Sequence, residues 1–357
     1  MSSASRKAAA GMTTGWLLRG KDNRLTAYAP TPDGVLRWTE TLPGGPGWTG
    51  PELLPHPGLL PHLAFAQTAE GYVHLLGLRD RPRAGGPKNR EVVHAVQFQT
   101  GRALRDWQPL GTPHTKDVNA AARTGRPSAV VDARGAVHLF VRNGNGHLSY
   151  RNQSPTGRWL GWGGVTPEGG KITGEMGAAV TDDGRIGILG PADGLMTHWS
   201  RPKPDAQPER AEEGDEPAAS AEETTGLCTG PGRLTHFWRD TGTRTLRAWR
   251  PGSAPTDLGG PGSGLPALLR TPVGGLDCTI LAARGPDGRP QVAAYPTETE
   301  EAGLNWTPTG EPCTGVPALA TDGRGRVVLA VVGEDGALRV TRQKDEPGLA
   351  LEAWSRV

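Results

Sequence analysis

The stretch from Ser128 to Val165, SAVVDARGAVHLFVRNGNGHLSYRNQSPTGRWLGWGGV, decides the fold of this chain. Apolar residues alternate with polar ones in short runs, and turns rich in glycine separate the runs. Alternation with a period of two is typical of β-strands with one buried face, and glycine permits tight turns between them. The stretch therefore predicts four strands of a meander, at 128–132, 136–142, 147–153 and 159–165.

The beginning of this pattern recurs along the whole chain. A turn residue is followed two positions later by an apolar residue, and usually by a second one two positions further on. The turn residues are Asn23, Gly71, Gly135, Gly184, Gly232, Gly274 and Gly325. A spacing of about fifty residues with period-two apolarity is typical of a β-propeller, in which each repeat forms one four-stranded sheet. The copies therefore predict seven blades.

We expect a single all-β domain, a seven-bladed β-propeller with four antiparallel strands per blade, over residues 13–357 after a disordered tail at 1–12. The 53 glycines and 33 prolines leave no stretch with a sustained helical period. Both terminal units contain all four strands, which predicts that whole blades dock to close the ring. The expected blades cover about 13–57, 58–114, 120–170, 171–201, 226–262, 263–311 and 312–357.

Two segments interrupt the repeat. Residues 79–90, RDRPRAGGPKNR, form a basic insertion between the second and third strands of the second unit. Residues 202–225 are rich in Glu, Ala and Pro and have almost no apolar side chains. Such a stretch cannot bury enough surface to offset the entropy of ordering it, so we expect this acidic loop to be disordered.

The charge balance points to no charged partner. The chain has 39 basic and 37 acidic side chains and a net charge of +2, which predicts neither nucleic-acid binding nor attraction to an anionic membrane. Residues 1–11 have no apolar core of a signal peptide, and no later segment approaches a membrane span. We expect a cytoplasmic protein without metal or cofactor, with release by lysis or non-classical export left open.

The segment Trp159–Val165, WLGWGGV, resembles the outer-strand signature W-S-G-W-x-x-L-G-G of the bacterial PLL-like lectins, which are seven-bladed propellers. Weaker copies of the signature occur at 47–53, 106–111, 305–307 and 353–355. The resemblance covers essentially the whole chain as a repeat and is close in the third unit. It implies a non-catalytic propeller that binds monosaccharides such as fucose or methylated sugars in clefts between blades.

An aromatic ring against the sugar is part of what the resemblance implies, because the C–H face of a sugar stacks on such a ring. The candidate ligand-binding residues are Trp38, Trp48, Tyr150, Trp159, Trp162, Trp199 and Trp249. A large ring at a fixed position in each blade also packs one sheet against the next, so each residue has a structural alternative. The fourth and fifth units lack the outer-strand tryptophan.

Catalysis is an alternative to sugar binding alone. Hydrolysis of a glycosidic bond uses two carboxylates that face each other across a cleft, and the acidic residues are the candidates for such a pair. Asp132, Asp182, Asp183 and Asp322 all lie at first-hairpin turns, where aspartate caps backbone amides. Glu175 precedes an inner strand and is the one acid expected to face a channel, without an evident partner. We therefore expect no enzyme, with a glycosidase or lyase as the weaker alternative.

A protein–protein interaction scaffold is the other alternative, with a partner bound on a propeller face or on the insertions. The histidines predict no metal site. His74 and His138 share one repeat position and are expected to form interblade hydrogen bonds or face solvent. His236 is expected in the core with its hydrogen bonds satisfied, and a role in the channel is the alternative.

Overall fold

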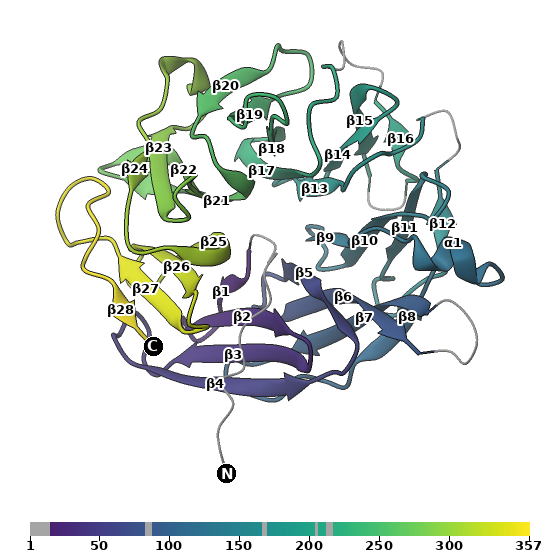
Figure 1. The fold of residues 1–357 in the computed structure, drawn as a ribbon, viewed down its shortest axis with the longest axis horizontal. Coiled ribbons are helices and arrows are strands. Elements are labelled where there is room, and N and C mark those ends of the chain that lie inside the picture. The colour runs from purple at the N-terminus through teal and green to yellow at the C-terminus, as the bar shows by residue number, and fades with distance from the viewer. Residues whose placement is uncertain (1–14, 83–87, 166–169, 204–205, 212–216) are drawn as a thin grey trace.

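Seven four-stranded antiparallel sheets stand around a central axis in the computed structural model, as the blades of a propeller do (Figure 1). The structure describes residues 15–82, 88–165, 170–203, 206–211 and 217–357. The predicted all-β, seven-bladed fold is confirmed. The tail expected at 1–12 lies outside the described residues.

The first four blades follow one another along the chain. Blade 1 contains β1 (Leu17–Arg19), β2 (Leu25–Thr31), β3 (Gly34–Glu40) and β4 (Trp48–Pro55). Blade 2 contains β5 (Leu59–Gln67), β6 (Val73–Arg81), β7 (Asn89–Gln97) and β8 (Gln108–Gly111). Blade 3 contains β9 (Ser128–Val131), β10 (Val137–Arg142), β11 (Leu148–Asn152) and β12 (Gly163–Gly164). Blade 4 contains β13 (Gly177–Val180), β14 (Ile186–Ala192), β15 (Leu195–Arg201) and β16 (Glu209–Arg210).

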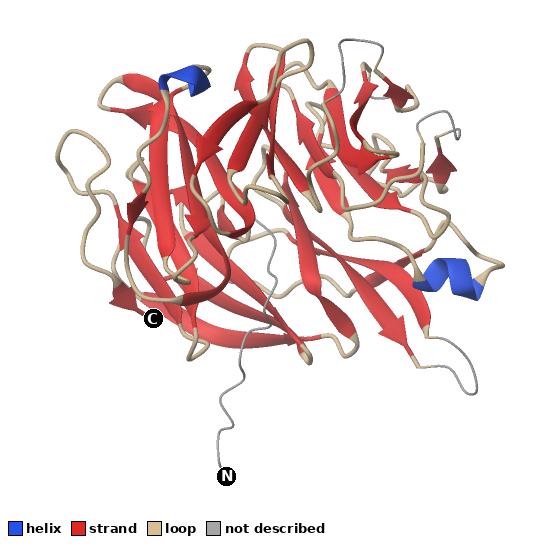
Figure 2. Ribbon diagram, turned by 45° about the horizontal axis from the view of Figure 1, so that its top comes forward, coloured by secondary structure: helices blue, strands red, loops and turns tan. Residues whose placement is uncertain are grey.

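Three further blades complete the ring, and two short helices lie in the loops at its periphery (Figure 2). Blade 5 contains β17 (Thr224–Gly230), β18 (Arg233–Arg239), β19 (Leu246–Trp249) and β20 (Thr256–Gly259). Blade 6 contains β21 (Ser263–Val273), β22 (Leu276–Arg284), β23 (Pro290–Pro296) and β24 (Thr307–Pro308). Blade 7 contains β25 (Cys313–Thr321), β26 (Val327–Gly333), β27 (Leu338–Arg342) and β28 (Ser355–Arg356). The helices are α1 (Val118–Ala122) and η2 (Glu300–Ala302).

The seven turn residues of the repeat all lie between the first and second strands of their blades, as predicted. Every one of them has a positive φ, between 59° for Gly274 and 85° for Gly184. Only glycine adopts this backbone region without steric cost, and asparagine tolerates it better than most residues, as Asn23 does here. The recurring glycines are therefore a direct consequence of the hairpin geometry.

The ring closes between blades 7 and 1 without exchange of a strand, because each sheet consists of four strands that are consecutive in the chain. The predicted docking of whole blades is confirmed. Across this seam, the Trp16 indole donates to the carbonyl oxygen of Val316 at 3.1 Å. The buried guanidinium of Arg342 donates to the buried carboxylate of Glu40 at 2.7 Å.

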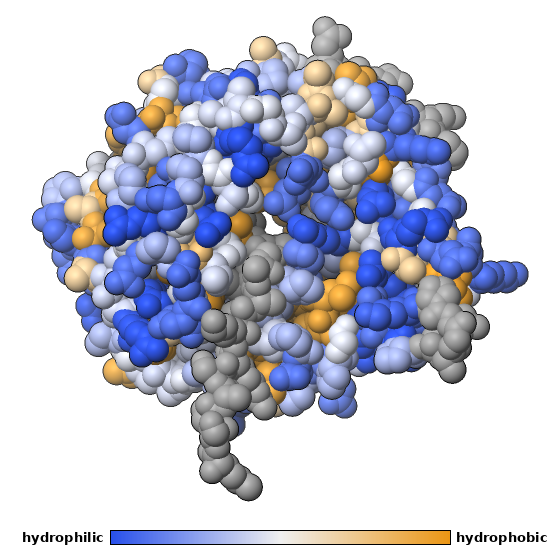
Figure 3. Space-filling model, viewed as in Figure 1, coloured by the Kyte–Doolittle hydropathy of each residue, from blue (hydrophilic) through white to orange (hydrophobic). Residues whose placement is uncertain are grey.

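Apolar side chains pack in layers between neighbouring sheets rather than in one central core. Leu25 of blade 1 and Val328 of blade 7 belong to one buried cluster, and Leu76 of blade 2 and Leu139 of blade 3 belong to another. The face of the ring in Figure 3 is mostly hydrophilic, with small apolar patches. Among the described residues, no helix has the length and apolarity needed to cross a membrane.

The two interruptions are built differently from each other. The basic insertion prolongs the β6–β7 hairpin, whose strands reach Arg81 and Asn89, and 83–87 lie outside the described residues. The acidic segment contributes β16 to blade 4, so the blade extends beyond its expected limit at residue 201. An outer strand needs only backbone pairing on one side, and both residues of β16 are exposed, which explains why apolarity did not reveal it. Residues 204–205 and 212–216 of this segment lie outside the described residues.

Candidate functional site

Three of the predicted aromatic residues occupy one equivalent position in the third strand of their blades. Trp38, Trp199 and Trp249 pair with the second apolar position of the repeat, which is Ala27, Ile188 and His236 respectively. Each of the three indoles is 1% exposed. Their rings pack sheet against sheet, and they offer no face to a ligand in this structure.

The tryptophans that precede outer strands connect each blade to the one before it. The indole N–H of Trp162 donates to the carbonyl oxygen of Leu110 at 3.0 Å, and Trp306 donates to that of Leu258 at 2.8 Å. Trp354 donates to the hydroxyl of Thr309 at 3.0 Å. We call these three hydrogen bonds the tryptophan links.

Two further tryptophans next to outer strands contribute to other interfaces by packing. Trp48 packs on the cluster shared by blades 7 and 1, and the ring of Trp107 stacks on His56 at 4.6 Å between centroids. Tryptophans in or next to outer strands thus help to hold neighbouring blades together.

Trp159 fills the gap between blades 2 and 3 together with two histidines. Its indole N–H donates to Nδ1 of His94 at 3.3 Å, and Nε2 of His94 lies 2.9 Å from Nδ1 of His74. Burial lowers the pKa of His74 to about 4, and burial followed by the charge of His74 lowers that of His94 to about 3. Both imidazoles are therefore neutral at pH 7 and act as packing and hydrogen-bonding groups.

Tyr150 lies between blades 3 and 4 under an arginine that the sequence analysis missed. The Arg201 guanidinium lies 5.7 Å from the Tyr150 ring centre and donates to Nδ1 of His138 at 2.6 Å. His138 in turn donates from Nε2 to Asp132 at 3.0 Å. The interblade hydrogen bond expected for His138 is confirmed.

A cavity of about 620 Å³ lies between blades 4 and 5. We call it the blade 4/5 cleft. Its lining comes from the first hairpins of both blades, from the third and fourth strands of blade 4 and from the loop that follows the third strand of blade 5. The lining residues used below are Arg185, Gly187, His198, Arg201, Glu209, Arg210, Ala211, Arg233 and Arg250.

Comparison with the gap between blades 2 and 3 explains why this cleft is open. His198 pairs with Leu189 as His94 pairs with Leu76, so the two histidines are equivalent. The position of His74, between the two apolar positions of the repeat, is occupied in blade 4 by Gly187. The imidazole of His74, which helps to fill the gap between blades 2 and 3, therefore has no counterpart between blades 4 and 5.

The loop from the third to the fourth strand is the second difference. In blade 3 this loop, 153–162, carries both Trp159 and Trp162, whereas in blade 5 it is Arg250–Pro255 and contains no tryptophan. Thr256 pairs with Ala248 as Gly163 pairs with Tyr150, which puts Pro255 at the position of Trp162. The missing outer-strand tryptophan of the fifth unit thus coincides with an open interblade cleft.

His236 lies beside the cleft, fully buried as predicted. Its ring contacts His198 and Trp249, with centroids 5.2 Å and 6.1 Å away. Neither ring nitrogen has a hydrogen-bond partner among the described residues, so the expectation of a satisfied core histidine is wrong. Burial lowers the pKa of His236 well below its usual range, which keeps the ring neutral.

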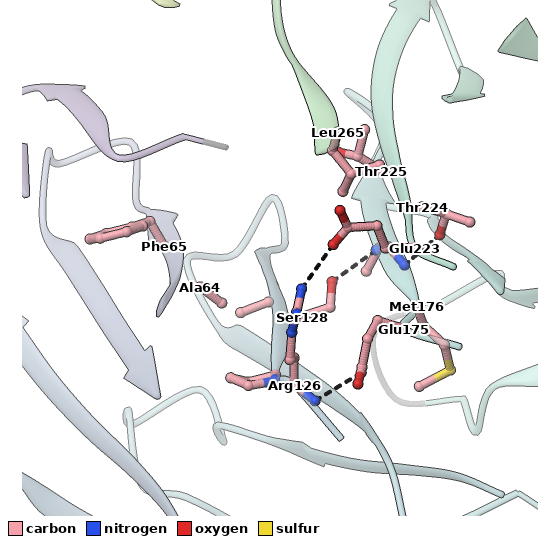
Figure 4. Close-up of a pocket in the computed structure, with 14 residues that line it drawn as sticks. Ala64, Phe65, Arg126, Ser128, Glu175, Met176, Glu223, Thr224, Thr225 and Leu265 are labelled. Carbon is pink, nitrogen blue, oxygen red and sulfur yellow. Dashed lines mark hydrogen bonds and ion pairs between the residues drawn. The ribbon is translucent and has the colours of Figure 1, made fainter. Parts of the chain in front are cut away.

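A second candidate site lies in the central channel, where the inner strands of several blades begin (Figure 4). The pocket measures about 180 Å³, and Arg126 stands between two glutamates (Figure 4). The backbone N–H of Arg126 donates to Glu175 at 2.8 Å, and its Nη1 donates to Glu223 at 2.9 Å. Arg142 lies 3.7 Å from the Glu175 carboxylate. The expectation that Glu175 has no partner is therefore wrong.

Burial raises the pKa of both channel glutamates, and the neighbouring arginines act in the opposite direction. For Glu175 the opposing charge is chiefly that of Arg142, and for Glu223 it is that of Arg126. Two carboxyl groups with raised pKa values in one pocket could exchange protons with a ligand.

The turn aspartates behave as the sequence indicated. Asp132 accepts hydrogen bonds from the backbone N–H groups of Arg134 and Ala136, and Asp322 accepts from those of Arg324 and Arg326. Asp182 accepts from the backbone N–H of Gly232 in the next blade. Within the described part of the chain, no group of three or more His, Cys, Asp or Glu residues is arranged to hold a metal ion.

No protein-family model and no curated protein matches this chain. The chain is similar in structure to the BP39L lectin from Burkholderia pseudomallei, with 14% identity, a TM-score of 0.66 and 99% of each chain covered. It is also similar to a polysaccharide lyase, the PL25 ulvan lyase, with 11% identity, a TM-score of 0.54 and coverage of 98% of this chain and 96% of that one. AofleA from Arthrobotrys oligospora matches with 9% identity, a TM-score of 0.53 and coverage of 100% and 88%. At these identities the likenesses establish the fold, and they confirm the predicted resemblance to lectin propellers at that level.

Proposed function

We propose that this chain is a non-catalytic carbohydrate-binding propeller and that its ligand site is the blade 4/5 cleft. The observation that carries the proposal is an open interblade cavity of about 620 Å³, at an interface whose equivalent in blades 2 and 3 is filled by a tryptophan and two histidines. Ligand sites typically measure roughly 300–1,000 Å³ and hold a few placed polar groups. The fold likeness to the BP39L lectin supports the same class of function.

The predicted aromatic residues divide into two groups under this proposal. Trp48, Tyr150, Trp159 and Trp162 keep part of each side chain accessible and remain proposed sugar contacts at other interfaces. Trp38, Trp199 and Trp249 are 1% exposed, and their role under this proposal is to hold the sheets in place.

A glycan array followed by calorimetry tests the proposal. We expect dissociation constants on the order of 0.1 to 1 mM for a single small-molecule site. Ala211→Phe places a ring in the cleft and should abolish binding. Ala302→Phe adds the same ring at an exposed position of blade 6 and should leave binding unchanged. Absence of binding across the array, or binding that survives Ala211→Phe, contradicts the proposal.

Cleavage of a glycosidic bond in the central channel is a second candidate, favoured by the Glu175–Arg126–Glu223 arrangement. The test is release of reducing or unsaturated ends from a polysaccharide panel, with Glu175→Gln and Glu223→Gln as variants. Turnover that both variants abolish supports an enzyme, and turnover unchanged in both excludes this pocket.

A further inference from the structure

The lining of the blade 4/5 cleft includes arginines from five separate segments. They are Arg185, Arg201, Arg210, Arg233 and Arg250. Among the described residues, the only acidic residue in the lining is Glu209. The chain as a whole is close to neutral, so this concentration of arginine is local.

Two of these arginines, Arg185 and Arg233, are exposed and are paired with acids that do not line the cleft. Arg185 lies 3.0 Å from Asp183, and Arg233 lies 2.6 Å from Glu298. Nη1 of Arg250 instead donates to the buried Glu300 of blade 6 at 3.1 Å, which turns this guanidinium away from the cleft. A guanidinium has five N–H donors in a planar fork, so one carboxylate fixes its orientation and leaves other donors for a ligand.

Arg201 is the most buried of the five, with a side chain that is 3% exposed. Its guanidinium donates to His138 of blade 3 and lies over the Tyr150 ring, so this charged group faces blade 3 and not the cleft. The positive charge at the cleft therefore comes chiefly from the exposed arginines Arg185, Arg210 and Arg233.

Aromatic surface for sugar stacking is scarce in the same cleft. His198 supplies the only aromatic ring among the described lining residues, and the nearby indole of Trp249 lies in the core. Recognition in this cleft must then rest mainly on N–H donors and positive charge. Planar guanidinium forks match the oxygen pairs of sulfate and carboxylate groups and form short, charge-assisted hydrogen bonds with them.

We propose that the blade 4/5 cleft selects anionic saccharides, which carry sulfate esters or uronic carboxylates, over neutral ones. This inference rests on the proposed carbohydrate-binding function and names the class of its ligand. A saccharide fits better than a free anion because the cavity, about 620 Å³, is far larger than a single sulfate ion.

Titration calorimetry on the full chain separates the possibilities with four probes: a chondroitin sulfate tetrasaccharide, its desulfated form, neutral chitotetraose and inorganic sulfate. We expect the sulfated tetrasaccharide to bind most tightly, the desulfated uronic form next, and chitotetraose and inorganic sulfate at least tenfold more weakly. Binding should weaken as salt rises, because screening reduces the charge attraction.

Single substitutions test which arginines bind the anionic groups of the saccharide. Arg185→Gln and Arg233→Gln should each weaken binding of the sulfated probe about tenfold, since a charge-assisted hydrogen bond is lost. Arg185→Lys keeps the charge but not the planar fork of donors, so its affinity for the sulfated probe should lie between those of the wild type and Arg185→Gln. Arg356→Gln removes an ion-paired surface arginine of blade 7 and should change nothing.

Each outcome has a distinct meaning. Equal binding of chitotetraose and the sulfated probe, abolished by Ala211→Phe, preserves the carbohydrate-binding proposal and overturns the anionic preference. Inorganic sulfate that binds as tightly as the tetrasaccharide also overturns it, because the site then recognises an anion without a sugar. Loss of all saccharide binding overturns both proposals.

Discussion

Two adjacent glycines provide a test of how the tryptophan links are built. Gly259 and Gly260 have φ values of 64° and 62°, so an alanine at either position bears nearly the same backbone strain. They differ in their surroundings: a Cβ on Gly259 would lie 3.9 Å from Trp306, whereas a Cβ on Gly260 would lie 2.3 Å from its Cε2 atom. The next blade's indole therefore seats directly on Gly260.

The magnitudes follow from this difference. Gly259→Ala should destabilise the protein by about 1–2 kcal/mol through backbone strain alone. Gly260→Ala should add about 1–3 kcal/mol, because an overpacked contact forces neighbouring groups to shift. In a Trp306→Ala background the extra cost should vanish and the two alanines should become equivalent.

Urea unfolding followed by circular dichroism measures all six proteins, which are the wild type, each alanine variant and the same three in the Trp306→Ala background. The coupling energy between Gly260→Ala and Trp306→Ala is the decisive quantity. Equal destabilisation by the two glycine substitutions, or a difference that persists without the indole, would refute the idea that Trp306 seats on Gly260.

Three further outcomes can be measured on the same protein. Trp306→Phe should cost about 1 kcal/mol in urea unfolding, because the 2.8 Å hydrogen bond to Leu258 is lost. Asp322→Ala should cost about 3 kcal/mol, because this buried carboxylate caps two backbone N–H groups and pairs with Arg326. The raised pKa values of Glu175 and Glu223 mean that folding favours their protonated forms, so their contribution to stability falls as pH rises above 4.5 through the folded pKa. Replacing both glutamates by Gln should reduce this loss of stability with rising pH. Urea midpoints of the double variant that change between pH 4 and 7 as steeply as those of the wild type would contradict this expectation.

The ring could be predicted from sequence because its signals are local. A positive φ at a hairpin turn selects glycine or asparagine whatever lies around it, so residues such as Gly135 and Asn23 mark the turns directly. The burial of alternate side chains leaves an equally local pattern.

The role of the aromatic residues could not be predicted in the same way. A tryptophan at a fixed repeat position suits both packing and stacking, and only burial distinguishes Trp199, in the core, from Trp159, at an accessible edge. The blade 4/5 cleft was missed because it is defined by what is absent, namely a counterpart of Trp159 in a shorter loop and a counterpart of His74 at Gly187. Aligning the repeats by their turn residues would have revealed the second difference.

The arginines of the cleft left no signal in the sequence. They lie in separate segments between Arg185 and Arg250, in a chain where arginine is common, and only the packing of blade 4 against blade 5 brings them together. The partners of Glu175 were hidden for the same reason, since Arg126 and Glu223 belong to other blades.

The seam between blades 7 and 1 has a consequence for synthesis. Glu40 is paired with Arg342, which follows 302 positions later in the chain. At typical translation rates of about 5–20 residues per second, roughly 15–60 s pass between the appearance of these two residues. Throughout that interval the Glu40 carboxylate cannot pair with Arg342, and the apolar side of blade 1 that packs against blade 7 stays uncovered. We expect the nascent chain to depend on chaperones for this period, and its earliest blade to be its most aggregation-prone part until the ring is complete.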